Sequence, residues 1–127
     1  MGVIKPEGSL LGEVASTGAR TVGSANAICT HTVAAVTGNR HLIHGFEVVV
    51  TGAVPGSDIT VEIKEGTNVI WQSAIGASAA IGSRTGAMFS KPLGGTSGGT
   101  VSLVASAGGS GVICTNSLST TTVPGQE

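Results

Sequence analysis

The most regular alternation of apolar and polar positions in the chain lies in residues 59–65, ITVEIKE. In an extended chain Ile59, Val61 and Ile63 share one face, and the polar residues between them share the other. This pattern predicts a strand with one buried and one solvated face. The preceding run, residues 41–51, is apolar at positions of both parities, which predicts a central strand covered on much of both faces. A turn-forming connection that contains Pro-Gly joins the two runs.

Weaker runs of the same kind recur along the chain between turns rich in glycine. Gly and β-branched residues disfavour helices, so no segment is a convincing helix. Short connections between neighbouring runs favour antiparallel pairing over parallel crossovers. About eight strands in one chain predict an all-β protein, either a β-sandwich or a barrel. The expected strands are residues 13–22, 27–36, 41–51, 59–65, 68–73, 84–89, 100–105 and 112–122.

The domain organisation follows from the same pattern. With 127 residues the chain is one domain, long enough to bury a core without help. We expect an N-terminal arm at residues 1–12, a β domain at residues 13–122 and a short polar tail at residues 123–127. In the arm, Leu10 and Leu11 are candidate contacts to a neighbouring subunit, and a frayed terminus is the alternative. No signal peptide and no apolar run of membrane-spanning length is visible.

Charged residues are scarce, with seven acidic against six basic side chains, and they form no basic stripe. A nucleic-acid partner is therefore not expected. The aromatic residues are also few, namely Phe46, Trp71 and Phe89, so the core must be built from aliphatic side chains. So little charge fits poorly with a freely circulating monomer. It predicts a surface that is covered in large part by partner subunits.

The one cluster with metal-ligand chemistry is H-x-x-H-x-x-E, formed by His41, His44 and Glu47, with His31 upstream. Ligands on a strand share a face when they are two residues apart, whereas these are three apart. His41 and Glu47 should point one way and His44 the other, unless a bulge at Gly45 shifts the alternation. We therefore expect no metal site, and interpret these residues as polar positions at a strand end or a subunit interface.

Cys29 and Cys114 lie on the first strong strand and on the last one. If those strands are neighbours in one sheet, as we expect for a jelly roll, the thiols approach each other. A bridge would then stabilise the fold by about 4–5 kcal/mol in the chain-entropy model. The alternative is a pair of buried free thiols. The absence of a secretion signal favours the free thiols.

No catalytic constellation is readable: there is no Ser-His-Asp set, nucleophile elbow, phosphate loop or dinucleotide fingerprint. The glycine-rich GGTSGGT lacks the Lys of a phosphate loop and is better explained as a flexible turn. We predict no catalytic residue, no cofactor and no enzymatic activity. Sugar binding is disfavoured by the shortage of aromatic side chains, with Trp71 as the only strong platform.

Several segments carry a resemblance to a known class of proteins. THTVAAVTGNRHLIHGFEVV leads through a Pro-Gly turn into SDITVEIKEGTNVIWQ, and FSKPLGG and TVSLVASAGGSGV follow. Over about residues 30–114 this order resembles the small jelly-roll, TNF-like virion proteins of tailed bacteriophages, including capsid decoration (cement) proteins. The resemblance implies a two-sheet jelly-roll β-sandwich of about eight antiparallel strands. It also implies a homotrimer, made in the host cytoplasm, that binds the major capsid protein on the outer shell.

The leading functional hypothesis is therefore a capsid decoration protein that stabilises the shell, with neither nucleic acid nor membrane as a partner. The alternative is a receptor- or glycan-binding module of a phage tail or head fibre, with its patch near Trp71 or in the loops. A third hypothesis, a cupin-like metalloenzyme, depends on a metal at His41 and His44.

Overall fold

The structure, a computed structural model, describes residues 17–125, and the expected arm at residues 1–12 lies outside them. The described chain forms eight β-strands, and it contains no helix that is long and apolar enough to cross a membrane. The strands are β1 (Thr17–Val22), β2 (Cys29–Val33), β3 (Asn39–Thr51), β4 (Ile59–Glu65), β5 (Asn68–Ile75), β6 (Arg84–Gly94), β7 (Val101–Ala105) and β8 (Ile113–Pro124).

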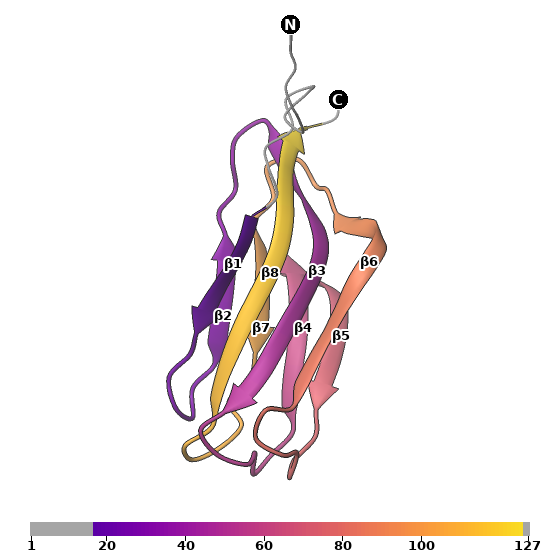
Figure 1. The fold of residues 1–127 in the computed structure, drawn as a ribbon. Coiled ribbons are helices and arrows are strands. Elements are labelled where there is room, and N and C mark those ends of the chain that lie inside the picture. Colours follow the sequence, from indigo (N-terminus) through magenta and orange to yellow (C-terminus); the bar gives the residue numbers. More distant parts are fainter. Residues whose placement is uncertain (1–16, 126–127) are drawn as a thin grey trace, which may run out of the picture.

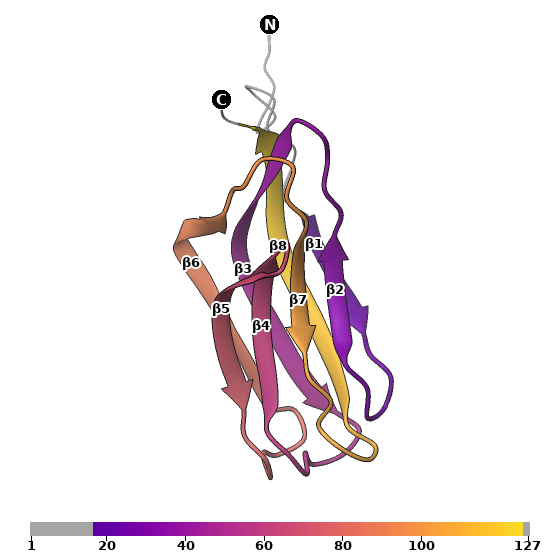
Figure 2. The ribbon, with the colours of Figure 1, turned by 180° about the vertical axis from the view of Figure 1, so that it is seen from behind.

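The strands form two antiparallel sheets of four strands each, stacked face to face (Figures 1 and 2). Sheet A has the order β1-β8-β3-β6 and sheet B the order β2-β7-β4-β5. The pairs β1–β8, β2–β7, β3–β6 and β4–β5 are therefore the rungs of one long antiparallel ribbon that is rolled into a sandwich. This is the jelly-roll topology, and the predicted fold class is confirmed.

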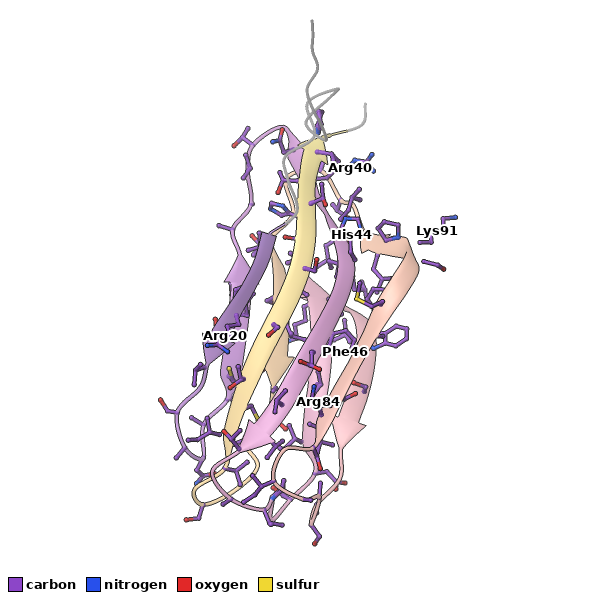
Figure 3. The ribbon with its side chains drawn as sticks, viewed as in Figure 1. Arg20, Arg40, His44, Phe46, Arg84 and Lys91 are labelled. Carbon is purple, nitrogen blue, oxygen red and sulfur yellow. The ribbon has the colours of Figure 1, made fainter. Side chains whose placement is uncertain are left out.

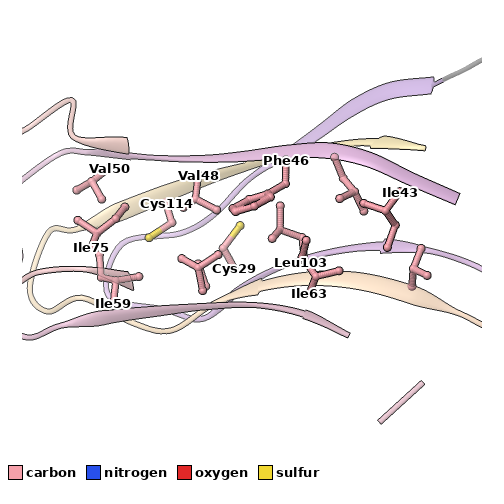
Figure 4. Close-up of a cluster of buried hydrophobic side chains, with 14 of the residues drawn as sticks. Cys29, Ile43, Phe46, Val48, Val50, Ile59, Ile63, Ile75, Leu103 and Cys114 are labelled. Carbon is pink, nitrogen blue, oxygen red and sulfur yellow. The ribbon is translucent and has the colours of Figure 1, made fainter. Parts of the chain in front are cut away.

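The core lies between the sheets and consists mainly of Val, Ile, Leu and Ala (Figure 4). The alternation expected for residues 59–65 is confirmed, because Ile59, Val61 and Ile63 of β4 are fully buried. β3 is central in sheet A, as expected, with its inner face buried and its outer face partly buried.

Three sets of side-chain hydrogen bonds join the two sheets. In the middle, the Asn116 Nδ2 of β8 donates to the carbonyl oxygens of Cys29 and Leu103 in sheet B, at 3.0 and 2.8 Å. At the β1/β2 side, the Thr21 hydroxyl lies 2.8 Å from His31 Nδ1. At the β5/β6 side, hydroxyl groups of Ser73 and Thr85 lie 3.1 Å apart. Hydrogen bonds thus join the two sheets at the centre of the sandwich, at the β1/β2 side and at the β5/β6 side.

The aromatic residues gather at the β5/β6 side of the sandwich. The rings of Trp71 and Phe89 have centroids 5.1 Å apart in an edge-to-face arrangement, and Phe46 lies 6.1 Å from Phe89. Phe46 is buried, while Trp71 is 38% exposed at the mouth of this side. The cluster therefore closes the gap between the two edge strands with the largest side chains of the chain.

Several strand bounds differ from those expected. β6 continues to Gly94 through Pro92, which lies in a stretch, residues 89–92, without register partners in β3, so the missing N–H of proline costs no ladder bond. β8 runs to Pro124, two residues beyond the expected domain limit at Thr122. Its pairing with β3 extends over the whole strand, from Ile113 to Pro124, which explains the extra length.

We predict that Asn116→Asp destabilises the fold. The change removes the two donated bonds and places a carboxyl among carbonyl oxygens in a site that is 0% exposed. An uncompensated buried charge costs about 3–5 kcal/mol. Because burial raises the pKa of a carboxyl, the loss should be larger at pH 7 than at pH 4, where the group is protonated.

Urea unfolding at the two pH values measures this effect. Asn68→Asp is the matched control, because Asn68 is exposed at the start of β5. An Asn116→Asp midpoint equal to that of the control at pH 7 would contradict the assigned role of the amide.

Candidate functional site

A shallow groove of about 610 Å³ lies on sheet A over β8, β3 and β6. The strand register explains its shape. Ser117, Glu47 and Gly86 lie side by side in one row across the three strands, and Arg20 of β1 continues the row. The groove is lined by Gly45, Phe46, Glu47, Arg84, Gly86, Ala87, Met88, Ser117, Leu118 and Ser119.

Two glycines keep the floor of the groove open. A Cβ on Gly86 would lie 2.6 Å from the carbonyl oxygen of Phe46, and one on Gly45 would lie 2.6 Å from the Met88 sulfur. Real Cβ atoms do not approach neighbours so closely, so a residue with a side chain would not fit at either position without a shift of its neighbours. At Gly86 the strands β3 and β6 therefore meet with no side chain between them, whereas the Met88 side chain lies over Gly45 and forms the wall of the groove; Met88 is 80% exposed.

Sheet A carries most of the positive charge of the described chain. Its strands hold four basic residues, Arg20, Arg40, Arg84 and Lys91, against the single acid Glu47 (Figure 3). The strands of sheet B hold Glu62, Lys64 and Glu65. In the groove, Arg84 Nη1 lies 3.1 Å from Glu47 Oε2, and both side chains are partly exposed. The groove thus contains one ion pair, Arg84–Glu47, on a sheet whose other charged strand residues are all basic.

A second surface is the distal end of the sandwich, which we define by its four loops, residues 23–28, 52–58, 76–83 and 106–112 (Figure 1). β8 ends at the opposite end of the molecule. The only charged residue in these loops is Asp58, and its carboxylate accepts a 2.8 Å bond from the Ala77 N–H. Half of the eight exposed large apolar side chains of the described chain lie in these loops or beside them, namely Val22, Ile28, Val54 and Ile81.

The loops of the distal end are tied to one another through the backbone. The Gly56 N–H donates to the Gly108 carbonyl at 2.9 Å, and the Asn26 N–H donates to the Val112 carbonyl at 2.8 Å. The Ser78 N–H donates to the Pro55 carbonyl at 2.9 Å, which joins the remaining loop to the others. The distal end is therefore a pre-organised, nearly uncharged surface.

The structure separates the candidate metal ligands. A bulge between Ile43 and Gly45 shifts the alternation of β3, as the sequence allowed. His41 is buried: its Nε2 donates to the Ala34 carbonyl and its Nδ1 bonds the Thr122 hydroxyl, both at 2.8 Å.

The other members of the cluster also have partners of their own. His44 Nε2 lies 2.7 Å from the Thr121 hydroxyl, and Glu47 pairs with Arg84. No group of three His, Cys, Asp or Glu side chains that would hold a metal occurs in residues 17–125. These histidines tie strands and loops together.

Cys29 and Cys114 are both free and buried in the structure. The expectation that their strands are sheet neighbours was wrong, because β2 belongs to sheet B and β8 to sheet A. The thiols face each other across the core instead (Figure 4). Burial raises the pKa of both thiols above the ordinary value of 9.0, and the nearby Cys29 raises that of Cys114 further.

The remaining sequence candidates lie elsewhere. Leu10 and Leu11 are outside the described residues. Trp71 is partly exposed at the β5/β6 side and does not line the groove. Sequence reasoning missed Arg84 and Met88, because only the register of β6 against β3 brings them beside Glu47 and Gly45. No local motif marks either residue.

The fold and its surfaces define a jelly-roll β-sandwich domain. No family model and no curated protein matches the chain. Among solved structures, it is similar to the CBM36-1 domain of a multidomain xylanase from the hindgut metagenome of Trinervitermes trinervoides. The match covers 91% of this chain and 90% of that chain, with 13% sequence identity and a TM-score of 0.39. A likeness this distant carries no argument about what the chain binds.

We predict that neither thiol reacts with DTNB in the folded protein at pH 8. The thiolate is the reactive form, and burial both raises the thiol pKa and blocks access. Ser110→Cys, on the exposed loop before β8, is the matched control and should react at once. Because unfolded thiols ionise first, the free energy of unfolding should also fall as the pH rises above about 9. Rapid labelling of the unmodified chain in native buffer would contradict the buried position of the thiols.

Proposed function

We propose that this chain is a non-catalytic structural protein of a tailed-phage virion, which attaches to the capsid shell through its distal end. The resemblance of residues 30–114 to jelly-roll decoration proteins supports the virion setting. The observation that carries the attachment is the distal end itself, which is apolar, nearly uncharged and fixed by bonds between its loops.

Three contributions to the binding free energy favour attachment at this end: burial of apolar side chains, desolvation of charge and loss of conformational freedom. Each exposed aliphatic side chain that becomes fully buried contributes about 1.5–3 kcal/mol. With Asp58 as the only charge in the loops, and already hydrogen-bonded, little desolvation of charge opposes contact. Loops that are already ordered also lose little conformational freedom on binding. The surface therefore suits an uncharged, apolar patch on a larger protein assembly.

Copies arranged around a symmetry axis would strengthen such an attachment through multivalency. The proposed partners are the major capsid protein and two further copies of this chain in a homotrimer. For contacts between copies, the β5/β6 side presents exposed Val69 and Trp71, and β5 itself carries no charged residue. A shell bridged in this way would resist internal pressure from the packaged genome.

The second candidate function is a receptor- or glycan-binding module of the virion. It is favoured by a different observation, the groove on sheet A with its Arg84–Glu47 pair. Because the groove and the distal end are separate surfaces, variants of each distinguish the two candidates.

We predict that the double substitution Val54→Asp and Ile81→Asp weakens binding to shells. Both side chains are more than half exposed, so the fold should tolerate the change, whereas buried carboxylates in an apolar contact are costly. We expect the apparent Kd for purified shells that lack the protein to rise by at least about tenfold, equivalent to 1.4 kcal/mol. Cosedimentation of labelled protein with the shells measures it.

Val36→Asp is the matched control, because Val36 is exposed in the loop between β2 and β3 at the other end of the sandwich. It should leave shell binding within about twofold of the unmodified chain, since surface changes away from a contact cost little. Equal binding by the double variant and the control would exclude attachment through the distal end. Shells that lose DNA on heating equally fast with and without the protein would remove the stabilising role.

A further inference from the structure

We propose that the groove on the outer face of sheet A binds an acidic saccharide, with Arg84 holding its carboxylate and Glu47 accepting its hydroxyl groups. The inference does not depend on attachment to a shell, because it concerns a different surface and different residues. Geometry, chemistry of the lining and charge support it in turn.

The geometry favours a ligand that lies on the sheet over one that pairs with it. The groove lies on the face of β8, β3 and β6. The backbone groups of β8 and β3 are committed to ladders on both sides, and only the far edge of β6 is left open. A peptide strand adds at a free edge, where backbone donors and acceptors remain open. Recognition in the groove therefore has to come from side chains, which suits a ligand rich in hydroxyl groups.

The polar lining matches the groups of such a ligand. Only the Arg84 Nη1 contacts Glu47, whereas a guanidinium carries five N–H donors in a planar fork. The remaining N–H donors of the guanidinium suit a carboxylate, which Arg binds through two parallel hydrogen bonds. Glu47 accepts hydrogen bonds from sugar hydroxyls, and Ser117, opposite it in the register, both donates and accepts.

The apolar lining sets the strength of binding. Met88 stands at the wall of the groove and offers a polarisable surface to the C–H groups of a sugar ring. No exposed aromatic ring lines the groove: Phe46 reaches it only from the floor and is 6% exposed. A single site should therefore bind weakly, and several copies on one particle would be needed for tight attachment.

Charge decides in favour of an acidic ligand over a neutral one. The strands of sheet A hold four basic residues against the single acid Glu47: Arg84 lines the groove and Arg20 lies beside it, whereas Arg40 and Lys91 lie farther off, toward the end at which β8 stops (Figure 3). Their summed field attracts anions to this face, and salt should screen that attraction. Arg20 lies in the same row as Glu47 and Ser117 and extends the positive surface beyond the groove.

The test uses tetragalacturonate as the probe and its fully methyl-esterified form as the neutral control. Binding to the intact chain is measured by isothermal titration calorimetry in low salt. Arg84→Gln should raise the Kd for tetragalacturonate at least tenfold, because it removes the charge and the fork together. Lys91→Gln is the matched control, with the same loss of charge on the same strand but outside the groove lining, and should change the Kd less than twofold.

Each outcome decides the inference. Loss of binding with Arg84→Gln and with the methyl ester, but not with Lys91→Gln, supports it. No detectable binding of tetragalacturonate, or equal binding of its ester, overturns it. Equal weakening by Arg84→Gln and Lys91→Gln shows diffuse attraction without a site and also overturns it. A poly-glutamate peptide that binds as tightly, with the same dependence on Arg84, would assign the groove to acidic protein segments instead.

Discussion

Of the side-chain hydrogen bonds that join the two sheets, those of the Asn116 amide are the buried ones, and they set the relative position of the sheets at the centre of the core. Burial of aliphatic side chains is strong but non-directional, and Phe46 is the one aromatic ring among the buried core residues of the described chain. The Asn116 Nδ2 supplies direction, because its bonds to Cys29 and Leu103 reach two strands of the opposite sheet. Its Oδ1 has no hydrogen-bond partner in the described chain, so burial of this amide oxygen lowers the free energy of unfolding even though the Nδ2 bonds orient the sheets.

Because hydrogen bonds fix the relative position of the two sheets, the surfaces of the sandwich can consist largely of small residues. Glycines and serines line the groove on sheet A, and glycine, alanine and serine dominate the four loops of the distal end. Bonds between loops replace the rigidity that larger side chains would supply. Positive charge gathers on sheet A while the distal end is left almost neutral, so the molecule presents two surfaces with different chemistry.

Local alternation was enough to predict the fold class and β4, because a strand with one buried face shows that face in its own residues. It was not enough to place Cys29 and Cys114, since alternation tells which face a residue occupies and not which sheet its strand joins. The groove was unpredictable for a related reason. Glu47, Arg84 and Met88 meet only through the pairing of β3 with β6, and the bulge before Gly45 sets that register.

A jelly roll hosts many unrelated functions, so the two surfaces have to be interpreted from their own chemistry. They are compatible with each other in one molecule. The four loops and the groove lining share no residue, although Arg84 directly follows the loop of residues 76–83, so a copy attached through its loops would leave most of the outer face of sheet A open. Weak binding in the groove would then gain from repetition, since an ordered shell supplies the many copies that a single shallow, non-aromatic site requires.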